Sequence, residues 1–161
     1  MIHLALYQPD IAQNTGTLLR LGACLDVPVH VIHPAGFALS DRNLKRAGMD
    51  YLERAALTEH ADWAAFEAWR ADGDEGGGHR LVALTTRAAT RYCDFAFAPG
   101  DVLLLGRESA GLPQAVHEAA NARIAIPQTE GTRSLNMAIA GAIATAEALR
   151  QLDAFPRPGG G

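Results

Sequence analysis

An almost wholly apolar run at residues 101–105 restricts the fold of this chain more than any other feature. Asp101 is followed by Val102 and three leucines, with no polar residue among them to face solvent. A strand of this kind is buried on both faces, which is typical of the middle of a parallel sheet. Neighbouring parallel strands in turn need long crossover connections, which are usually helices.

The rest of the chain supplies that alternation of strands and helices. Apolar and β-branched runs predict further strands at residues 2–7, 27–32, 80–86 and 123–126. Apolar spacing predicts helices at residues 14–25, 41–47, 61–71, 113–120 and 134–152. We expect Asn14 or Thr15 to cap the first of these helices and Ser134 to cap the last. The predicted fold class is α/β, a parallel sheet with helices on both faces.

Length and composition predict a single domain. The 161 residues match the usual domain size of roughly 100–200 residues. We assign residues 1–155 to this domain and expect the Pro- and Gly-rich residues 156–161 to form a disordered tail. No apolar run reaches the ~20 residues that span a bilayer, and the chain starts without the basic segment of a signal peptide. We therefore expect a cytoplasmic protein with no membrane contact.

The charge balance argues mildly against a nucleic-acid partner. The net charge is −4, whereas phosphate binding needs Lys and Arg at the contact. A local basic patch is still compatible with this balance, because Arg42, Lys45 and Arg46 fall within one or two helical turns. Ordinary solvated surface charge explains these residues equally well.

The two cysteines indicate neither a disulfide framework nor a metal site. Cys24 and Cys93 belong to no CxxC motif, and no His/Cys cluster accompanies them. We expect both to be small core residues, and we expect no bound metal.

Three segments place small or polar residues at the carboxyl ends of predicted strands, where open α/β sheets bind ligands. The first contains Asn14, Thr15 and Gly16, with Arg20 following. It brings an amide, a hydroxyl and a guanidinium within two turns of a helix start. Its structural alternative is that Asn14 caps the helix while Arg20 lies in solvent.

The second segment is residues 106–113. Gly106 and Gly111 let the backbone turn sharply and approach a ligand closely, and Glu108 places a carboxylate at the edge of that turn. It is not a Walker A loop, because Leu and Pro follow Gly111 where that motif has Lys and Ser or Thr. Taken alone, it is also compatible with an ordinary strand-to-helix loop.

The third segment runs from Ile126 and Pro127 to Ser134, Leu135 and Asn136, and leads into a helix rich in alanine. The small residues of this helix allow another backbone or another subunit to approach closely. The alternative is a core helix with an Ala-rich face.

In this order, the three segments resemble those of the SPOUT superfamily of RNA ribose methyltransferases, over nearly the whole chain. Within it, the short length, the opening residues 6–11 and residues 46–51 are similar to the branch that methylates the 2'-hydroxyl of cytidine or uridine at tRNA position 34. The resemblance implies an α/β knot fold, with a deep trefoil knot in the C-terminal half, which is a rare exception among protein topologies.

The same resemblance implies a site for S-adenosylmethionine. The residues that match its cofactor-binding positions are Leu84, Gly106, Ile126, Ser134, Leu135 and Asn136. The product would be S-adenosylhomocysteine, and the RNA partner the anticodon stem-loop of tRNA. It also implies a homodimer, for which the helices after Asn14 and after Ser134 are the natural interface elements, since a two-fold contact must be self-complementary.

The resemblance further implies that Arg20 is catalytic, as the general base, and we expect Asn14 and Glu108 to take part in catalysis as well. A guanidinium keeps its proton in proteins, so we expect Arg20 to stabilise the developing alkoxide and to hold a phosphate. A phosphate oxygen, a water molecule or Glu108 would receive the proton, while Asn14 and Asn136 orient the reactants. This chemistry requires no metal.

Two other functions remain open at this point. One keeps the enzyme class but targets another tRNA nucleotide or a ribosomal RNA. The other is a non-enzymatic nucleotide-binding domain, for which the sheet and glycine loops would suffice. Phe37, Tyr51 or Tyr92 could stack on a splayed anticodon base, although burial in the core is the more common role for such residues.

Overall fold

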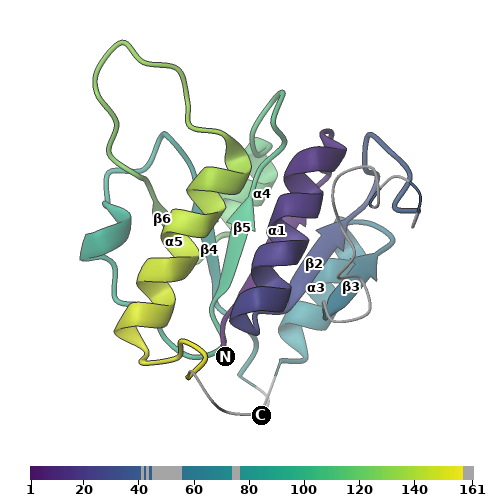
Figure 1. The fold of residues 1–161 in the computed structure, drawn as a ribbon, viewed down its shortest axis with the longest axis horizontal. Helices are drawn as coiled ribbons and strands as arrows, with labels where there is room; N and C mark the ends of the chain where they lie inside the picture. The colour runs from purple at the N-terminus through teal and green to yellow at the C-terminus, as the bar shows by residue number, and fades with distance from the viewer. Residues whose placement is uncertain (41, 43, 45–55, 74–76, 158–161) are drawn as a thin grey trace.

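The computed structural model of the chain describes residues 1–40, 42, 44, 56–73 and 77–157. Its centre is a six-stranded sheet in the order β3-β2-β1-β5-β4-β6, and every strand pair is parallel. The strands are β1 (His3–Tyr7), β2 (Val29–Ile32), β3 (Leu57–His60), β4 (Leu81–Leu84), β5 (Val102–Leu105) and β6 (Ala122–Ile124). The α/β class and the parallel sheet are confirmed (Figure 1).

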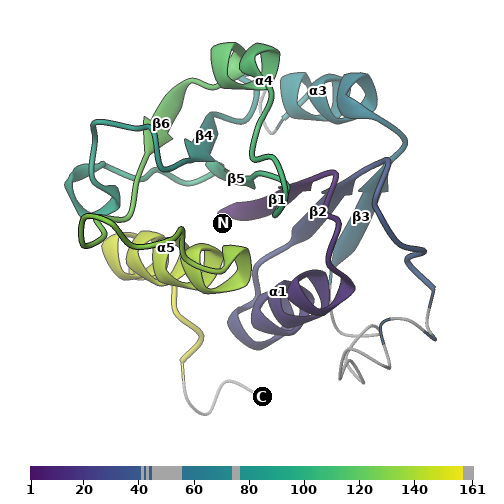
Figure 2. The same ribbon diagram turned by 90° about the horizontal axis from the view of Figure 1, so that it is seen from above.

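Helices cover both faces of the sheet. The helices are α1 (Ala12–Leu25), α3 (Trp63–Ala71), α4 (Gln114–Ala119) and α5 (Met137–Gln151), with a one-turn helix η2 (Tyr92–Asp94). Figure 2 shows α1 and α5 on one face and α3 and α4 on the other. The central strands therefore face helices on both sides, as the apolar run at 101–105 predicts.

The core divides into two layers, one on each side of the sheet. In β5, Leu103 and Leu105 pack in the layer beneath α1 and α5, whereas Leu104 packs in the opposite layer with Phe66 of α3. This alternation follows from the two-residue period of a strand. All the side chains of β5 are buried, so both layers are apolar and the strand has no solvent face.

The order of the strands creates a natural ligand site. The chain moves outward from β1 through β2 to β3, and later returns to add β5, β4 and β6 on the other side of β1. The direction of winding thus reverses between β1 and β5. Open α/β sheets bind ligands at the carboxyl ends of the strands at this reversal, where the segments after β1 and β5 meet.

Several expectations about local structure are wrong. Neither Asn14 nor Thr15 caps α1, because that helix begins at Ala12 after Ile11. Asn136 caps α5 in place of Ser134, because its side chain accepts from Ala138 N and Ile139 N. Both cysteines are exposed. Cys24 follows the buried Gly22 by two positions, which turns its side chain to the opposite side of the helix, and Cys93 lies in η2, which has no buried residue.

The strand β3 was not expected, and its sequence explains why. Its pattern is Leu-Thr-Glu-His with two exposed residues in the middle, so it shows neither an apolar run nor a clear alternation. It lies at the edge of the sheet, where pairing with β2 alone suffices. The predicted helix at 41–47 and the predicted tail at 156–161 lie largely outside the described residues.

No helix among the described residues is long and apolar enough to cross a membrane.

Candidate functional site

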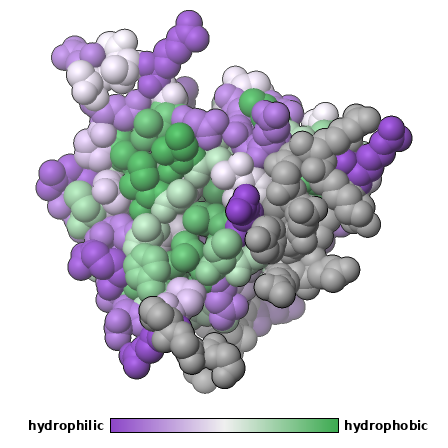
Figure 3. Space-filling model, viewed as in Figure 1, coloured by the Kyte–Doolittle hydropathy of each residue, from purple (hydrophilic) through white to green (hydrophobic). Residues whose placement is uncertain are grey.

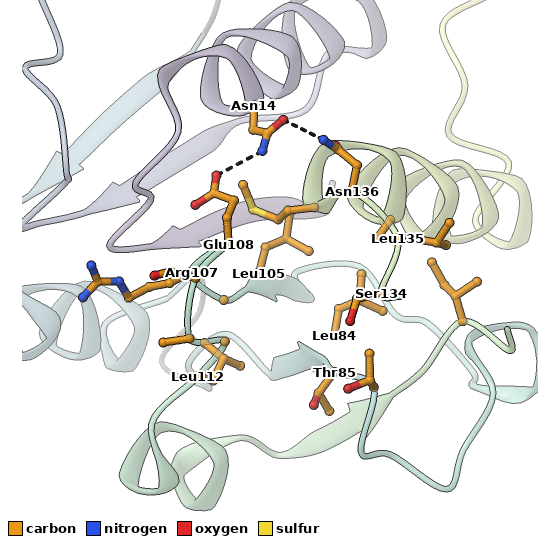
Figure 4. A pocket seen from close by; sticks show the side chains of 18 of the residues that line it. Asn14, Leu84, Thr85, Leu105, Arg107, Glu108, Leu112, Ser134, Leu135 and Asn136 are labelled. Carbon is orange, nitrogen blue, oxygen red and sulfur yellow. Dashed lines mark hydrogen bonds between the residues drawn. The ribbon is translucent and has the colours of Figure 1, made fainter. Parts of the chain in front are cut away.

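A pocket of about 590 Å³ opens at the carboxyl ends of β4, β5 and β6. It is lined by the start of α1, the segments after those three strands and the start of α5 (Figure 4). Eight of the nine residues singled out from the sequence line this pocket. They are Asn14, Leu84, Gly106, Glu108, Ile126, Ser134, Leu135 and Asn136. The exception is Arg20.

The segment after β5 forms a tight turn that only glycine allows at its first position. Arg107 N donates to Gly111 O at 3.1 Å, and Gly111 N donates to Arg107 O at 2.8 Å, so the turn is closed by its own backbone. A Cβ on Gly106 would lie 2.6 Å from the carbonyl carbon of Gly111. Gly111 has a φ of 66°, which L side chains rarely adopt. The turn thus presents backbone to the pocket at close range.

Hydrogen bonds between side chains join the three candidate segments, and the donor and acceptor of each bond can be assigned from the cap of α5. Asn136 Oδ1 accepts from the backbone N–H groups of Ala138 and Ile139, at 2.9 and 3.3 Å. Its amide nitrogen therefore faces Asn14 and donates to Oδ1 of that residue at 3.0 Å. The cap of α5 thus fixes how both amides are turned.

The same series of hydrogen bonds ends at Glu108. Because Asn14 Oδ1 is an acceptor, its Nδ2 group points to Glu108 Oε1, at 3.4 Å. Figure 4 shows the two amides and the carboxyl group in line above the pocket. The first, second and third candidate segments are therefore in direct contact, although they are far apart in the sequence.

Glu108 also contacts Asp10, which the sequence analysis did not select. Asp10 N donates to Glu108 Oε2 at 2.9 Å, and Glu108 N donates to Asp10 Oδ1 at 3.1 Å. Burial raises the pKa of Glu108, and the carboxyl group of Asp10 raises it further. Its hydrogen bond with Glu108 lowers the pKa of Asp10 to about 2. Of the two carboxyl groups, Glu108 is therefore the one that takes up a proton first as the pH falls.

A signal for Asp10 was present in the sequence. It stands three residues after a predicted strand and directly after Pro9, in the position where loops of parallel sheets carry functional groups. It was overlooked because it does not belong to any of the three segments, and it does not line the pocket itself.

Two arginines are among the described residues that line the pocket. Arg87 and Arg107 line it, and Arg107 lies 3.7 Å from Asp10. Arg20 is exposed on α1. It follows Asn14 by six residues, a spacing that places the two side chains on different sides of the helix. Arg42 is exposed, whereas Lys45 and Arg46 lie outside the described residues.

Two of the three aromatic residues that could stack on a base are described by the structure. Tyr92 is half-buried and packs against the core, and Phe37 is half-buried after β2. Tyr51 lies outside the described residues. Among the described residues there is no group of three or more His, Cys, Asp or Glu side chains that could hold a metal ion.

The pocket fits a nucleoside-sized ligand. Its volume lies within the roughly 300–1,000 Å³ of small-molecule sites. Leu84, Ile126 and Leu135 give it apolar walls, while Gly106 and Gly111 line it with backbone atoms alone. These features fit a flat adenine ring and a ribose that are bound mainly by backbone groups and apolar contact.

Over most of its length, the chain is similar in sequence to known RNA methyltransferases. The model of the SpoU rRNA Methylase family matches residues 1–146. A tRNA (cytidine(34)-2'-O)-methyltransferase of Ancylobacter novellus is 58% identical over 158 residues, which are 98% of each chain. The tRNA (cytidine(34)-2'-O)-methyltransferase of Escherichia coli strain K12 is 39% identical over 154 residues, 94% of each chain.

Solved structures of RNA methyltransferases are similar in fold to this chain. A structure solved for the 2-OH methylation of C/U34 on tRNA has a TM-score of 0.86 and 42% identity, covering 95% of this chain and 97% of that one. An AdoMet-bound rRNA methyltransferase from Sinorhizobium meliloti has a TM-score of 0.81 and 27% identity, covering 94% of this chain and 56% of that one.

Proposed function

The chain belongs to the SpoU rRNA methylase family, and from this we propose that it methylates the 2'-hydroxyl of nucleotide 34 in tRNA with S-adenosylmethionine as donor. The substrate nucleotide is cytidine or a modified uridine at the wobble position of the anticodon stem-loop. The observation that carries the proposal is the convergence of Asn136, Asn14 and Glu108 at one pocket. We take residues 1–155 as one methyltransferase domain that acts in the cytoplasm.

The pocket supports S-adenosylmethionine as the ligand. Leu84, Gly106, Ile126, Ser134, Leu135 and Asn136, all of which line it, would hold the adenosine part. When bound, this group supplies a methyl carbon on a sulfonium, which a ribose oxygen can attack. The chain has to bring that oxygen into line and to stabilise its charge as its proton leaves.

Arg20 and the side chains that line the pocket divide this work. Arg20 stabilises the developing alkoxide and holds the adjacent phosphate, because a guanidinium remains charged and matches phosphate geometry. Asn14 and Asn136 orient the reactants through amides that the cap of α5 holds in place. A phosphate oxygen, a water molecule or Glu108 takes the proton, and the raised pKa of Glu108 brings this carboxylate closer to the range of an effective base.

The active unit that we propose is a homodimer formed through α1 and α5. Apolar atoms gather over α5 and along its border with α1 (Figure 3). Ile139, Ile11 and Leu135 are 53%, 44% and 37% exposed, respectively, and two of these three line the rim of the pocket. A two-fold contact at this face would cover them and would bring Arg20 of one subunit toward the pocket of the other.

We also propose that the C-terminal half is threaded as a trefoil knot. Two features support it. β5 is inserted between β1 and β4, and the segment from β6 to α5 pairs with the loop after β4 at Arg91 and Ala125 before α5 packs on α1. A crystal structure whose backbone could be straightened by pulling both ends would contradict this threading.

The proposed function is tested by methyl transfer in vitro. Purified protein, labelled S-adenosylmethionine and unmodified tRNA should give a 2'-O-methylated nucleotide at position 34 in mass spectra of the anticodon fragment. Methylation at another tRNA position, or of ribosomal RNA only, would keep the enzyme class and change the substrate. Calorimetry with S-adenosylmethionine and S-adenosylhomocysteine distinguishes the non-enzymatic alternative, for which neither would bind.

A further inference from the structure

Asp10 lies outside the pocket and contacts three consecutive residues of the turn that lines it. Its backbone N–H donates to Glu108, and its Oδ1 accepts from Glu108 N. Its Oδ2 accepts from Ser109 Oγ and lies 3.7 Å from the Arg107 guanidinium. The side chain and the backbone N–H of one residue, Asp10, thus connect the loop after β1 to the turn after β5.

The two bonds between Asp10 and Glu108 are reciprocal. Each residue donates its backbone N–H to the carboxyl group of the other, although 98 positions separate them in the sequence. Two such bonds fix both the distance and the relative rotation of the two loops. They also hold Glu108 Oε2, so that Oε1 is the oxygen that meets Asn14.

Asp10 is itself held in place from the other side. Gly36 N donates to Pro9 O at 2.8 Å, and a Cβ on Gly36 would lie 3.0 Å from both Cα and Cβ of Asp10. The loop after β2 therefore packs closely on the loop that carries Asp10. Little space remains for Asp10 to move relative to the sheet, which makes it a firm support for the turn at 107–111.

We infer that Asp10 is a positioning residue for the methyl transfer, since it holds the carboxyl group of Glu108 in the orientation that receives the amide of Asn14. The inference rests on the proposed function. Without Asp10, the turn would keep its own backbone bonds between Arg107 and Gly111. Glu108 would, however, lose the contact that sets its rotation, and the contact between the second and first segments would loosen.

Asp10 is also the charged neighbour that acts on Glu108. Asn14 of α1 is neutral, as is Asn136 of α5 behind it, and Arg107 on the same turn is directed to Asp10. Replacing Asp10 by asparagine therefore removes a negative charge next to Glu108 and should lower the pKa of Glu108.

The inference can be tested by comparing the methylation rates of Asp10→Asn and the wild type. Asp26→Asn is the matched control, because Asp26 is an exposed aspartate at the other end of α1. We expect Asp10→Asn to slow single-turnover methylation between about tenfold and a hundredfold, as small misplacements do, with little change in the affinity for S-adenosylhomocysteine. Asp26→Asn should keep the wild-type rate. A rate in Asp10→Asn equal to that control would overturn the inference.

A double-mutant cycle shows whether Asp10 acts through Glu108. If it does, Asp10→Asn should change the rate by less than about twofold when Glu108→Gln is already present, because the residues share one interaction. Independent losses that multiply in the double variant would contradict this. All rates are compared at a temperature well below the melting temperature of each variant, so that unfolding does not contribute.

Two measurements on the protein alone do not depend on activity. Carboxyl-carbon NMR should show Glu108 titrating at lower pH in Asp10→Asn than in the wild type, whereas a merely structural role would leave its titration unchanged. Hydrogen exchange should become faster at residues 106–112 and stay the same in α5; faster exchange over the whole chain would contradict the inference. If the wild type itself fails to methylate nucleotide 34, the proposed function fails, and these two measurements still decide the role of Asp10.

Discussion

The side-chain amide of Asn136 donates to Asn14 at 3.0 Å, although 122 positions separate the two residues. Asn136 also caps α5 with its side-chain oxygen. One residue thus begins a helix and, through its other atom, contacts the first segment of the site. The structure of α5 and the arrangement of the pocket therefore depend on the same side chain.

Substitutions at Asn136 should separate these two roles. Asn136→Asp keeps an oxygen for the cap but cannot donate to Asn14, whereas Asn136→Ala loses both. We expect Asn136→Asp to keep the stability of the wild type and to lose at least about tenfold in methylation rate. Asn136→Ala should also lose about 1 kcal/mol of unfolding free energy, as cap removal does. Urea unfolding and single-turnover rates measure both effects, and full activity in Asn136→Asp would refute the role of the amide.

Gly106→Ala should weaken cofactor binding. The new Cβ would lie 2.6 Å from the carbonyl carbon of Gly111 and 2.9 Å from Leu112 N, and backbone atoms cannot move aside as side chains can. We expect the affinity for S-adenosylhomocysteine to fall at least about tenfold in calorimetry, because the turn must open. Gly77→Ala is the control, since a Cβ there meets nothing within 4 Å. Equal affinities in the two variants would show that the turn at Gly106 is not part of the binding site.

Mixed dimers should show that Arg20 acts across the subunit interface. Arg20→Ala and Gly106→Ala subunits are each expected to form inactive homodimers. After random mixing, half of the dimers contain one subunit of each kind, and each of these has one intact site if Arg20 serves the partner's pocket. The mixture should then recover about a quarter of the wild-type activity. No recovery, with mixed dimers confirmed by native mass spectrometry, would mean that Arg20 serves its own subunit. An active Arg20→Ala homodimer would show that the site does not need Arg20.

Stability should fall in acid because of a buried histidine. His30 in β2 lies against Trp69, with ring centroids 4.0 Å apart. Burial, together with the nearby His3, His60 and His79, lowers its pKa to about 3. In the unfolded chain this pKa is near 6.5, so the unfolded state binds more protons below that pH. The stabilisation is complete above about pH 6.5 and is lost as the pH falls toward 3.

The measurement for His30 is urea unfolding between about pH 7 and about pH 4. One histidine changes the free energy of unfolding by at most about 1.4 kcal/mol per pH unit. His30→Gln should therefore make the free energy of unfolding depend less steeply on pH. His33→Gln serves as control, because His33 is only partly buried and pairs with Glu59 on the surface. An unchanged slope in His30→Gln would show that His30 does not bind the proton on unfolding.

The sequence predicted which residues gather at the pocket better than it predicted the details of the elements that hold them. Leu84, Gly106 and Ile126 were identified because they match the cofactor-binding positions of the family that the chain resembles. The segments at Gly106 and Ile126 also stand at the carboxyl ends of predicted strands, which a parallel sheet brings to one edge. The role of Asn14 was only partly foreseen. Its amide was available for a helix cap in the sequence, but α1 begins two residues earlier, and the amide serves Asn136 and Glu108 instead.

What the sequence could not predict depends on long-range contacts. The reciprocal bonds of Asp10 and Glu108 join loops 98 residues apart, and no local pattern indicates such a pair. The exposure of Cys24 and the edge strand at β3 likewise follow from tertiary packing, which overrides local preference. Arg20 was selected from its motif alone, and within one subunit it does not line the pocket.

If the pocket serves ribose methylation of nucleotide 34, cells that lack this protein should lose one tRNA modification. Mass spectrometry of tRNA nucleosides and anticodon fragments can measure this in a strain that lacks the protein, complemented with the wild type or with Asn136→Asp. The 2'-O-methyl group at position 34 should disappear without the protein, return with the wild type and not return fully with Asn136→Asp. An unchanged 2'-O-methyl group at position 34 in the strain that lacks the protein would contradict this role of the pocket.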